Sequence, residues 1–346
     1  MLSCATRRPE HRASQGRLAA RAPAWLLGWV AALLCAGSMV PCAAAVAEPL
    51  PVVVDLDIGD DIDDSFALAL LLASPRLQLL GISTAWGDTA LRVRLVHRLL
   101  RETGHAGIPV FEGVATPSTT LFSQARWAAG PSGRPPAPLK PADGRSVDAL
   151  LQLARRQPGQ VTLLALGPLT NLAAAIDRDP QGFRLFRQVV MMGGSVRTGY
   201  GQSDYRPPRP PDREYNIVSD PAAAQSLFAS GVPIVMMPLD ATLVRLDDQR
   251  RAALFSQGSA MTDALALMYL QWTHGGQPWA SATPTLFDVV PVAWLLNPQR
   301  CPTTPLRIEV SDAGDTREVA GAPNAQVCLS VDKTAVLEDL MQALLR

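Results

Sequence analysis

The sequence contains few lysines, no excess charge of either sign and no long hydrophobic run, and each scarcity excludes a class of function. Only Lys140 and Lys333 are lysines. The 31 basic and 31 acidic residues balance, so the chain lacks the positive surface of a nucleic-acid-binding protein. The apolar stretch Trp25 to Val40 is too short for a confident transmembrane helix. We therefore expect no nucleic-acid partner and no stable membrane span after processing.

The first 47 residues have the layout of a secretory signal peptide. Five arginines precede the apolar stretch, and Ala45-Val46-Ala47 fits a cleavage site before Glu48. We expect cleavage there and a periplasmic or secreted protein; an uncleaved anchor is the alternative. The leader removes five arginines and one glutamate, which leaves 26 basic and 30 acidic residues. Residues 48–346 are numerous enough to bury one large core, so we expect one domain.

Cysteine is also scarce. Three of the five cysteines lie in the leader, which leaves only Cys301 and Cys328. An even pair in an exported protein indicates a disulfide, and two buried free thiols are the alternative.

Apolar strand patterns alternate with helical patterns along residues 48–346. Strands are predicted at 52–54, 77–84, 108–111, 161–166, 189–192 and 234–237, and helices at 91–103, 147–156, 172–177 and 221–230. In the first of these helices, Arg92, Arg94 and Arg98 are expected to face outward. This alternation predicts an α/β fold with a central, mostly parallel sheet flanked by helices. Residues 114–145 are rich in proline, glycine and serine and lack periodicity, which indicates a flexible loop or lid.

An acidic turn joins the first predicted strand to the next helix. Six aspartates, the largest local concentration of charge, occupy it: Asp55, Asp57, Asp60, Asp61, Asp63 and Asp64. Like charges at this density repel one another strongly unless a cation offsets them. Carboxylate oxygens favour Ca²⁺ or Mg²⁺, and ligands of open α/β sheets bind at the carboxyl ends of strands. A solvated loop that only caps the helix is the alternative.

Further polar motifs follow the later strands. The ordered set, which is more specific than any single member, is Gly81-Ile-Ser-Thr-Ala-Trp-Gly-Asp88, Leu166-Gly-Pro-Leu-Thr-Asn171, Met192-Gly-Gly194, Glu214-Tyr-Asn216 and Phe287-Asp288. With the acidic turn, this set resembles the inosine/uridine-preferring nucleoside hydrolase family over essentially the whole mature chain. The resemblance implies an α/β fold, a Ca²⁺ ion at the strand ends and hydrolysis of the N-glycosidic bond of ribonucleosides to free base and ribose.

The resemblance also assigns roles to residues. Asp57, Asp64, Asp288 and the backbone carbonyl of Thr170 would bind Ca²⁺, and Asp57 would also be the base toward the attacking water. Ribose would contact Asp63, Asp88, Glu214 and Asn216. Such carboxylates suit an oxocarbenium-like transition state, because they stabilise its positive charge. Asp55 is either a further ligand or a support behind the ligands. Other residues have structural alternatives: Thr170-Asn171 and Asp288 as helix caps, and Glu214 with Asn216 as ordinary loop residues.

The chain departs from the family pattern where the base should bind. The acidic motif is two residues longer than usual, which adds Asp60 and Asp61. Phe287 stands where several relatives have histidine before the distal aspartate. His274 is the replacement acid that lies nearest Asp288 in sequence, although a solvated loop residue is its simpler interpretation. Stacking on Trp86, Trp127, Trp272 or Trp279 would be another way to activate the leaving base.

Two other functions fit parts of the sequence. A strand that ends in Asp-x-Asp also resembles a haloacid-dehalogenase-type phosphatase, but neither lysine follows a strand as that mechanism requires. An exported, non-catalytic nucleoside- or ribose-binding protein of the same fold is the main alternative, because the leaving-group histidine is missing. The expected partner is in either case a small-molecule nucleoside. The base preference is not readable from the sequence, and a homo-oligomer is left open.

Overall fold

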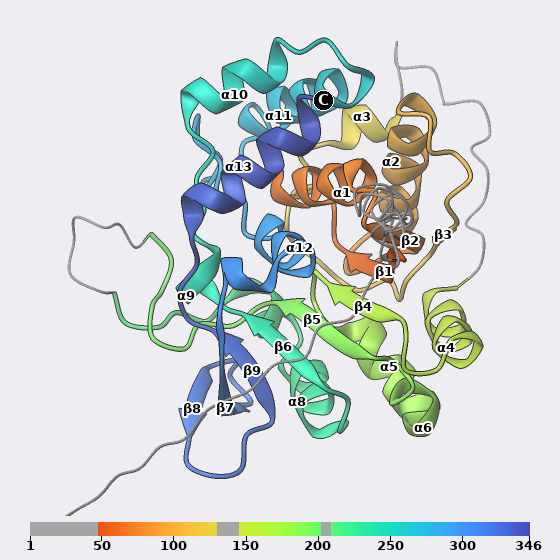
Figure 1. The fold of residues 1–346 in the computed structure, drawn as a ribbon, viewed down its shortest axis with the longest axis vertical. Helices are drawn as coiled ribbons and strands as arrows, with labels where there is room; N and C mark the ends of the chain where they lie inside the picture. The colour runs from red at the N-terminus through yellow and green to blue at the C-terminus, as the bar shows by residue number, and fades with distance from the viewer. Residues whose placement is uncertain (1–47, 130–144, 202–208) are drawn as a thin grey trace, which may run out of the picture. The chain divides into compact units, whose positions relative to one another are not determined.

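The computed structural model describes residues 48–129, 145–201 and 209–346, so the predicted signal peptide lies outside the described residues. Strands and helices alternate over most of this length (Figure 1). The strands are β1 (Leu50–Leu56), β2 (Leu77–Thr84), β3 (Val110–Phe111), β4 (Thr162–Ala165), β5 (Gln188–Met192), β6 (Ile234–Met237), β7 (Thr303–Val310), β8 (Thr316–Val319) and β9 (Ala325–Cys328). The longer helices are α1 (Asp63–Ala73), α2 (Thr89–Glu102), α4 (Ser146–Arg156), α5 (Thr170–Arg178), α8 (Pro221–Ala229), α10 (Asp248–Phe255), α11 (Ala260–Thr273), α12 (Val289–Leu296) and α13 (Lys333–Leu344). Four shorter helices, α3 (Ala125–Ala129), α6 (Pro180–Phe183), α7 (Tyr215–Ser219) and α9 (Leu239–Thr242), lie in the connections.

The described strands form one nine-stranded sheet in the order β3-β2-β1-β4-β5-β6-β9-β7-β8. The strands from β3 to β9 in this order pair in parallel, and only β7 and β8 run antiparallel to their neighbours. The α/β prediction is therefore confirmed. The chain moves outward from β1 in one direction through β2 and β3, and in the other through β4, β5 and β6. Ligands of open α/β sheets bind at such a reversal point, beyond the carboxyl ends of the strands.

Helices cover both faces of the sheet and enclose two hydrophobic cores (Figure 1). One core contains side chains of α1, α2, α11, α12 and α13, and the other contains side chains of α4, α5, α6 and α8. Residues Asp63 to Leu71 of α1 are all buried. This helix is apolar almost all round because the sheet, α11, α12 and α13 surround it. Its position fixes the acidic turn that leads into it.

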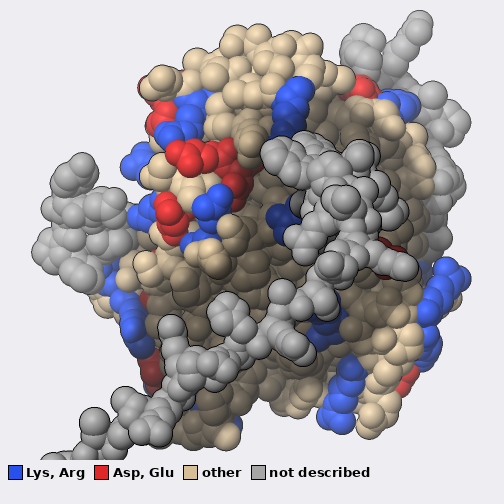
Figure 2. All heavy atoms as spheres, viewed as in Figure 1, with Lys and Arg blue, Asp and Glu red and all other residues tan. Residues whose placement is uncertain are grey.

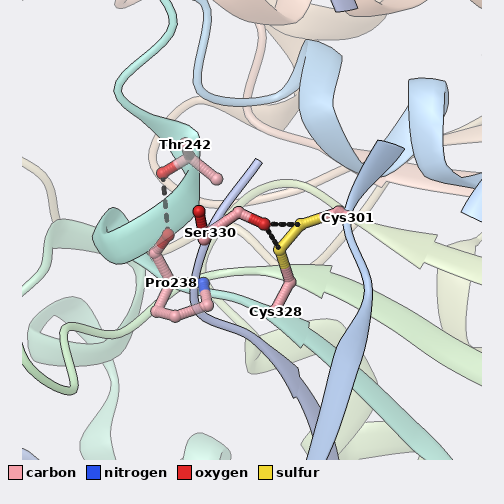
Figure 3. Close-up of a disulfide and its surroundings, with 5 residues drawn as sticks. All are labelled: Pro238, Thr242, Cys301, Cys328 and Ser330. Carbon is pink, nitrogen blue, oxygen red and sulfur yellow. Dashed lines mark hydrogen bonds between the residues drawn. A yellow bond between two sulfur atoms is a disulfide. The ribbon is translucent and has the colours of Figure 1, made fainter. Parts of the chain in front are cut away.

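The predicted disulfide is present between Cys301 and Cys328, whose Cα atoms are 5.7 Å apart. Both sulfurs lie against the backbone carbonyl of Ser330 (Figure 3). The bridge closes the segment that contains the antiparallel pair β7 and β8. The antiparallel edge was not predicted, because half-exposed strands lack the continuous apolar run that marks the parallel ones.

Charged side chains are interspersed on the molecular face drawn in Figure 2. Acidic side chains gather at the upper left, where basic ones alternate with them, and the other described basic residues on this face are scattered. Among the described residues, no helix combines the length and apolar character needed to cross a membrane.

Candidate functional site

A cavity of about 530 Å³ opens at the carboxyl ends of the central strands. It has an acidic floor, an aromatic and aliphatic wall, and one basic residue, Arg213. The residues that line it are Asp57, Asp60, Asp61, Asp63, Asp64, Thr120, Leu166, Met192, Tyr200, Arg213, Glu214, Tyr215, Asn216, Val218, Trp279, Phe287 and Asp288. Its volume is in the range of small-molecule sites.

Asp57 approaches the cavity beside the turn after β4. Gly167 begins that turn, and a Cβ atom there would lie 2.7 Å from Oδ1 of Asp57. Only glycine therefore lets the two turns lie so close. Asp55, in contrast, points away from the cavity: its Oδ1 accepts hydrogen bonds from Ser83 and from Nδ2 of Asn171 (2.8 Å). Asp55 thus supports the turn from behind.

Three carboxylates meet on the cavity floor. Oxygens of Asp63, Asp64 and Asp288 lie within 4.8 Å of one another, and all three residues are buried. Asp63 and Asp64 form the first turn of α1, and Asp288 stands directly before α12. The carboxylate of Asp288 does not cap that helix, and Oδ1 of Asp64 has no hydrogen-bond partner among the described residues.

This donor set fits a hard divalent cation. Every candidate ligand is an oxygen, as Ca²⁺ and Mg²⁺ require, and a cation would give the buried oxygen of Asp64 the partner it lacks. Burial raises the pKa of Asp63, Asp64 and Asp288 well above the ordinary value, and the neighbouring carboxylates raise it further. Burial likewise raises the pKa of Asp57 to about 7, although Arg92 opposes this shift. A bound cation would reverse these shifts by favouring the charged carboxylates.

Arg92 is buried under the acidic turn, so the prediction that it faces outward was wrong. Its side chain is 1% exposed, and its Nη2 lies 2.8 Å from Oδ2 of Asp60. Arg94, on the same helix, is exposed as predicted. Arg98 is only partly exposed and packs its guanidinium 3.9 Å from the ring centroid of Trp127. Asp60, one of the two additional acids, is therefore already paired with a cation.

The segment between Val114 and Ala129 packs against the acidic turn, and only 130–144 of the predicted loop lies outside the described residues. Oγ of Ser123 donates to the carbonyls of Gly59 (3.2 Å) and Asp60 (2.9 Å). Nε2 of Gln124 donates to the carbonyl of Asp61 (2.7 Å). Three residues before Ser123, Oγ1 of Thr120 is 3.0 Å from the hydroxyl of Tyr215.

Glu214 and Asn216 are both buried, so neither is an ordinary loop residue. The Glu214 carboxylate accepts from the backbone N–H groups of Gly194, Asn216 and Ile217 and caps α7. Nδ2 of Asn216 donates to the carbonyls of Leu166 (2.9 Å) and Met192 (3.2 Å). These bonds join the ends of β4 and β5 to α7, and they fix both side chains at the cavity wall.

Three of the residues predicted for the site do not line the cavity. Thr170 is the first residue of α5, and its hydroxyl donates to Asp220 (2.6 Å). Asp88 is exposed and caps α2 by accepting from the backbone of Leu91. His274 is an exposed residue at the end of α11, with Nδ1 2.8 Å from the carbonyl of Leu270.

The aromatic side chains at the cavity are mostly not those predicted. Trp279 lines it and is 49% exposed, and Phe287 lines it with Tyr200, 6.0 Å away in an edge-to-face contact. Trp127 and Trp272 are buried in the core, and Trp86 does not line the cavity. Among the described residues, no histidine lines the cavity.

Sequence reasoning missed Leu166, Tyr200 and Arg92. Leu166 lines the cavity directly after β4, where the strand pattern ends, and this position was the available signal. Tyr200 lies in a connection without periodicity, so nothing in the sequence marks it. The crowded acids of the turn indicate that a cation must lie nearby, but nothing in the sequence singles out Arg92 as that cation.

Comparison with known proteins agrees with this architecture. The family model described as inosine-uridine preferring nucleoside hydrolase matches residues 52–338. The pyrimidine-specific ribonucleoside hydrolase RihA of Citrobacter koseri is 29% identical over 316 residues, which are 85% of this chain and 98% of that protein. An uncharacterised protein of Schizosaccharomyces pombe is 31% identical over 262 residues, 72% of this chain and 81% of that protein. The solved plant nucleoside hydrolase PpNRh1 has a TM-score of 0.74 at 25% identity and covers 86% of this chain and 99% of its own. The chain belongs to the inosine-uridine preferring nucleoside hydrolase family.

Proposed function

We propose that this protein hydrolyses the N-glycosidic bond of ribonucleosides and that it requires Ca²⁺. The observation that carries the proposal is the group of three buried carboxylates, Asp63, Asp64 and Asp288, on the floor of a cavity that Asp57 and Asn216 also line. Family membership supports the reaction class. The all-oxygen ligand set supports a hard cation, and Ca²⁺ tolerates the irregular carboxylate geometry better than Mg²⁺.

The cavity residues suit cleavage of a ribosyl C–N bond. Positive charge develops on the sugar as the bond breaks, and the acidic floor stabilises it. When bound, Ca²⁺ would polarise a water molecule and offset the charge of the carboxylates. We assign to Asp57, which lines the cavity, the role of the base that accepts the proton of the attacking water. Oδ1 of Asn216 is left to accept a ribose hydroxyl, because its Nδ2 already donates to two carbonyls.

The leaving base would meet the apolar side of the cavity. Phe287 and Trp279 offer faces for stacking, and Tyr215 offers a hydroxyl. No histidine is found among the described residues of the cavity, so stacking and hydrogen bonding would activate the leaving base in place of an acidic histidine. This wall combines apolar rings with polar groups, which suit purine and pyrimidine bases alike.

Release of ribose from inosine and uridine by the protein starting at Glu48 tests the proposal. We expect turnover with both or one of these substrates, its loss in a chelator, and its return when Ca²⁺ is added in excess. Stoichiometric nucleoside binding without release of ribose would instead support the non-catalytic binding protein. Activity that is unaffected by the chelator would remove Ca²⁺ from the proposal.

Export is the second part of the proposal and rests on the leader sequence alone. We expect the mature protein to begin at Glu48, in the periplasm or the medium. Intact-mass measurement of protein from cell fractions tests this, and a chain that retains residues 1–47 in the membrane fraction would favour the anchor.

A further inference from the structure

We propose that Arg92 is a positioning residue for the cation site: it fixes the backbone of the acidic turn, while Asp60 serves as its partner and not as a metal ligand. The inference rests on the proposed function, because it assumes that the carboxylates of this turn bind a cation. Asp60 lies in the two-residue extension of the acidic motif, and Arg92 lies on α2, the helix that follows β2.

The guanidinium of Arg92 joins the turns that follow β1 and β2. Its Nε donates to the carbonyl of Trp86 (2.8 Å), and its Nη1 donates to the carbonyls of Asp57 and Ile58 (2.9 Å for Ile58). Its Nη2 binds Asp60 (2.8 Å). All three nitrogens are thus engaged in a side chain that is almost fully buried. The planar guanidinium can donate in several fixed directions, which a lysine ammonium on a flexible stem cannot reproduce.

The acidic turn depends on donors from outside, because its backbone carbonyls are not paired in a regular pattern of helix or sheet hydrogen bonds. Each backbone carbonyl from Asp57 to Asp61 accepts a hydrogen bond from outside the turn. Arg92 serves the first two, and Ser123 and Gln124 serve the last three. Buried carbonyls without donors are costly, so loss of Arg92 would release the part of the backbone that carries Asp57.

Trp86 provides an independent sign of constraint. It has a positive φ of 62°, which is unusual for a bulky residue. Its carbonyl is the one that Nε of Arg92 holds. Arg92 therefore stabilises a strained turn after β2 together with the acidic turn after β1, and the two turns keep a fixed relation to each other.

Charge and positioning predict opposite effects when Arg92 is replaced, and this contrast makes the role testable. A cation near a Ca²⁺ site repels the ion, so by charge alone Arg92→Met would tighten Ca²⁺ binding. By positioning, the same change would weaken it, because the ligands lose their fixed geometry. Arg92→Lys keeps the charge, and Arg92→Met/Asp60→Asn keeps the pair neutral, so charge alone predicts little change for either.

The experiment is calorimetric titration of the metal-free protein with Ca²⁺, without substrate, for wild type and these three variants. Losses of supporting residues around metal ligands weaken binding by about 10–100-fold, and we expect that range for all three. Arg94→Met, on the exposed side of the same helix, is the matched control and should bind like wild type. Circular dichroism and thermal melts establish that each variant is folded.

Asp60→Asn and Asp64→Asn supply a second comparison that keeps the Arg92 contacts to the backbone. Asp60→Asn should weaken Ca²⁺ binding clearly less than Asp64→Asn, because only the second change removes a proposed ligand. Equal losses in these two variants would overturn the proposal, as would wild-type affinity in Arg92→Lys. Absence of Ca²⁺ binding in wild type would instead contradict the proposed function.

Discussion

Asp57 is the residue on which catalysis is expected to depend most. Asp57→Asn keeps an oxygen at the cavity but removes the base, so kcat for nucleoside hydrolysis should fall by about 10²–10⁴-fold. Binding of ribose should weaken much less. Steady-state rates and ribose inhibition constants for both proteins measure this difference. An equal loss in rate and in ribose affinity would mean that Asp57 holds the sugar and does not act as a base.

The buried carboxylates predict an unusual pH dependence for the metal-free protein. Burial raises the pKa of Asp57 to about 7 and that of Asp55 to about 6, from 3.8. The folded state therefore binds more protons than the unfolded state between these values, and stability must fall as pH rises from about 4 to 7. Each such group contributes up to about 1.4 kcal/mol per pH unit within its window.

Chemical denaturation in chelator at several pH values tests this expectation. Excess Ca²⁺ should flatten the trend, because the ion favours the charged carboxylates in the folded state. A free energy of unfolding that rises between pH 5 and 7 without metal would contradict the shifts.

The acids of the acidic turn were readable from the sequence because they lie together in one short motif after a strand, and Asp288 because it lies in the Phe287-Asp288 motif directly before α12. Asp88 occupies a matching motif, yet its side chain caps α2. The hydroxyl of Thr170, whose backbone carbonyl is the predicted ligand, donates to Asp220. A motif identifies residue types, whereas which atom faces the cavity depends on the packing of separate turns. Arg92 shows the same limit: the three arginines on one helix suggest a solvated face, and only contact with the distant turn buries one of them.

At the scale of elements, the hydrogen bond between Thr120 and Tyr215 connects the segment before α3 to α7 across the cavity. Tyr215→Phe and Thr120→Val each remove this hydrogen bond, and each should lower kcat/KM by an amount that corresponds to about 1 kcal/mol. The loss should appear mainly as a higher KM, since the bond orders the cavity wall. The double variant should lose no more kcat/KM than either single variant, because both changes remove the same interaction. Additive losses in kcat/KM would show that the two residues act separately.

The bridge between Cys301 and Cys328 stabilises the antiparallel edge of the sheet. On the loop-entropy model, its removal by Cys301→Ala/Cys328→Ala should lower the free energy of unfolding by about 3 kcal/mol. Turnover at 25 °C should persist, because neither cysteine lines the cavity. Denaturant titrations with and without reductant measure the effect in the wild-type protein. Unchanged stability on reduction would contradict a stabilising bridge.

The parallel strands were predictable because they are buried on both faces and appear as continuous apolar runs. The strand at residues 77–84 was predicted at the bounds that the structure has. The edge formed by β7 and β8 escaped because its side chains are half exposed. The nine-strand order was also not predictable, since long-range pairing of β9 between β6 and β7 leaves no local pattern.

At the scale of the whole molecule, the site joins residues from distant parts of the chain. The acidic turn follows the first strand, whereas Asp288 precedes α12, and α12 and α13 both pack on α1. During synthesis or export the acidic turn therefore emerges long before the carboxylate that completes its group. A cation can bind the full ligand set only after α12 has docked. Uptake of the ion would thus report the docking of α12, and a probe such as a luminescent lanthanide could follow that step in time.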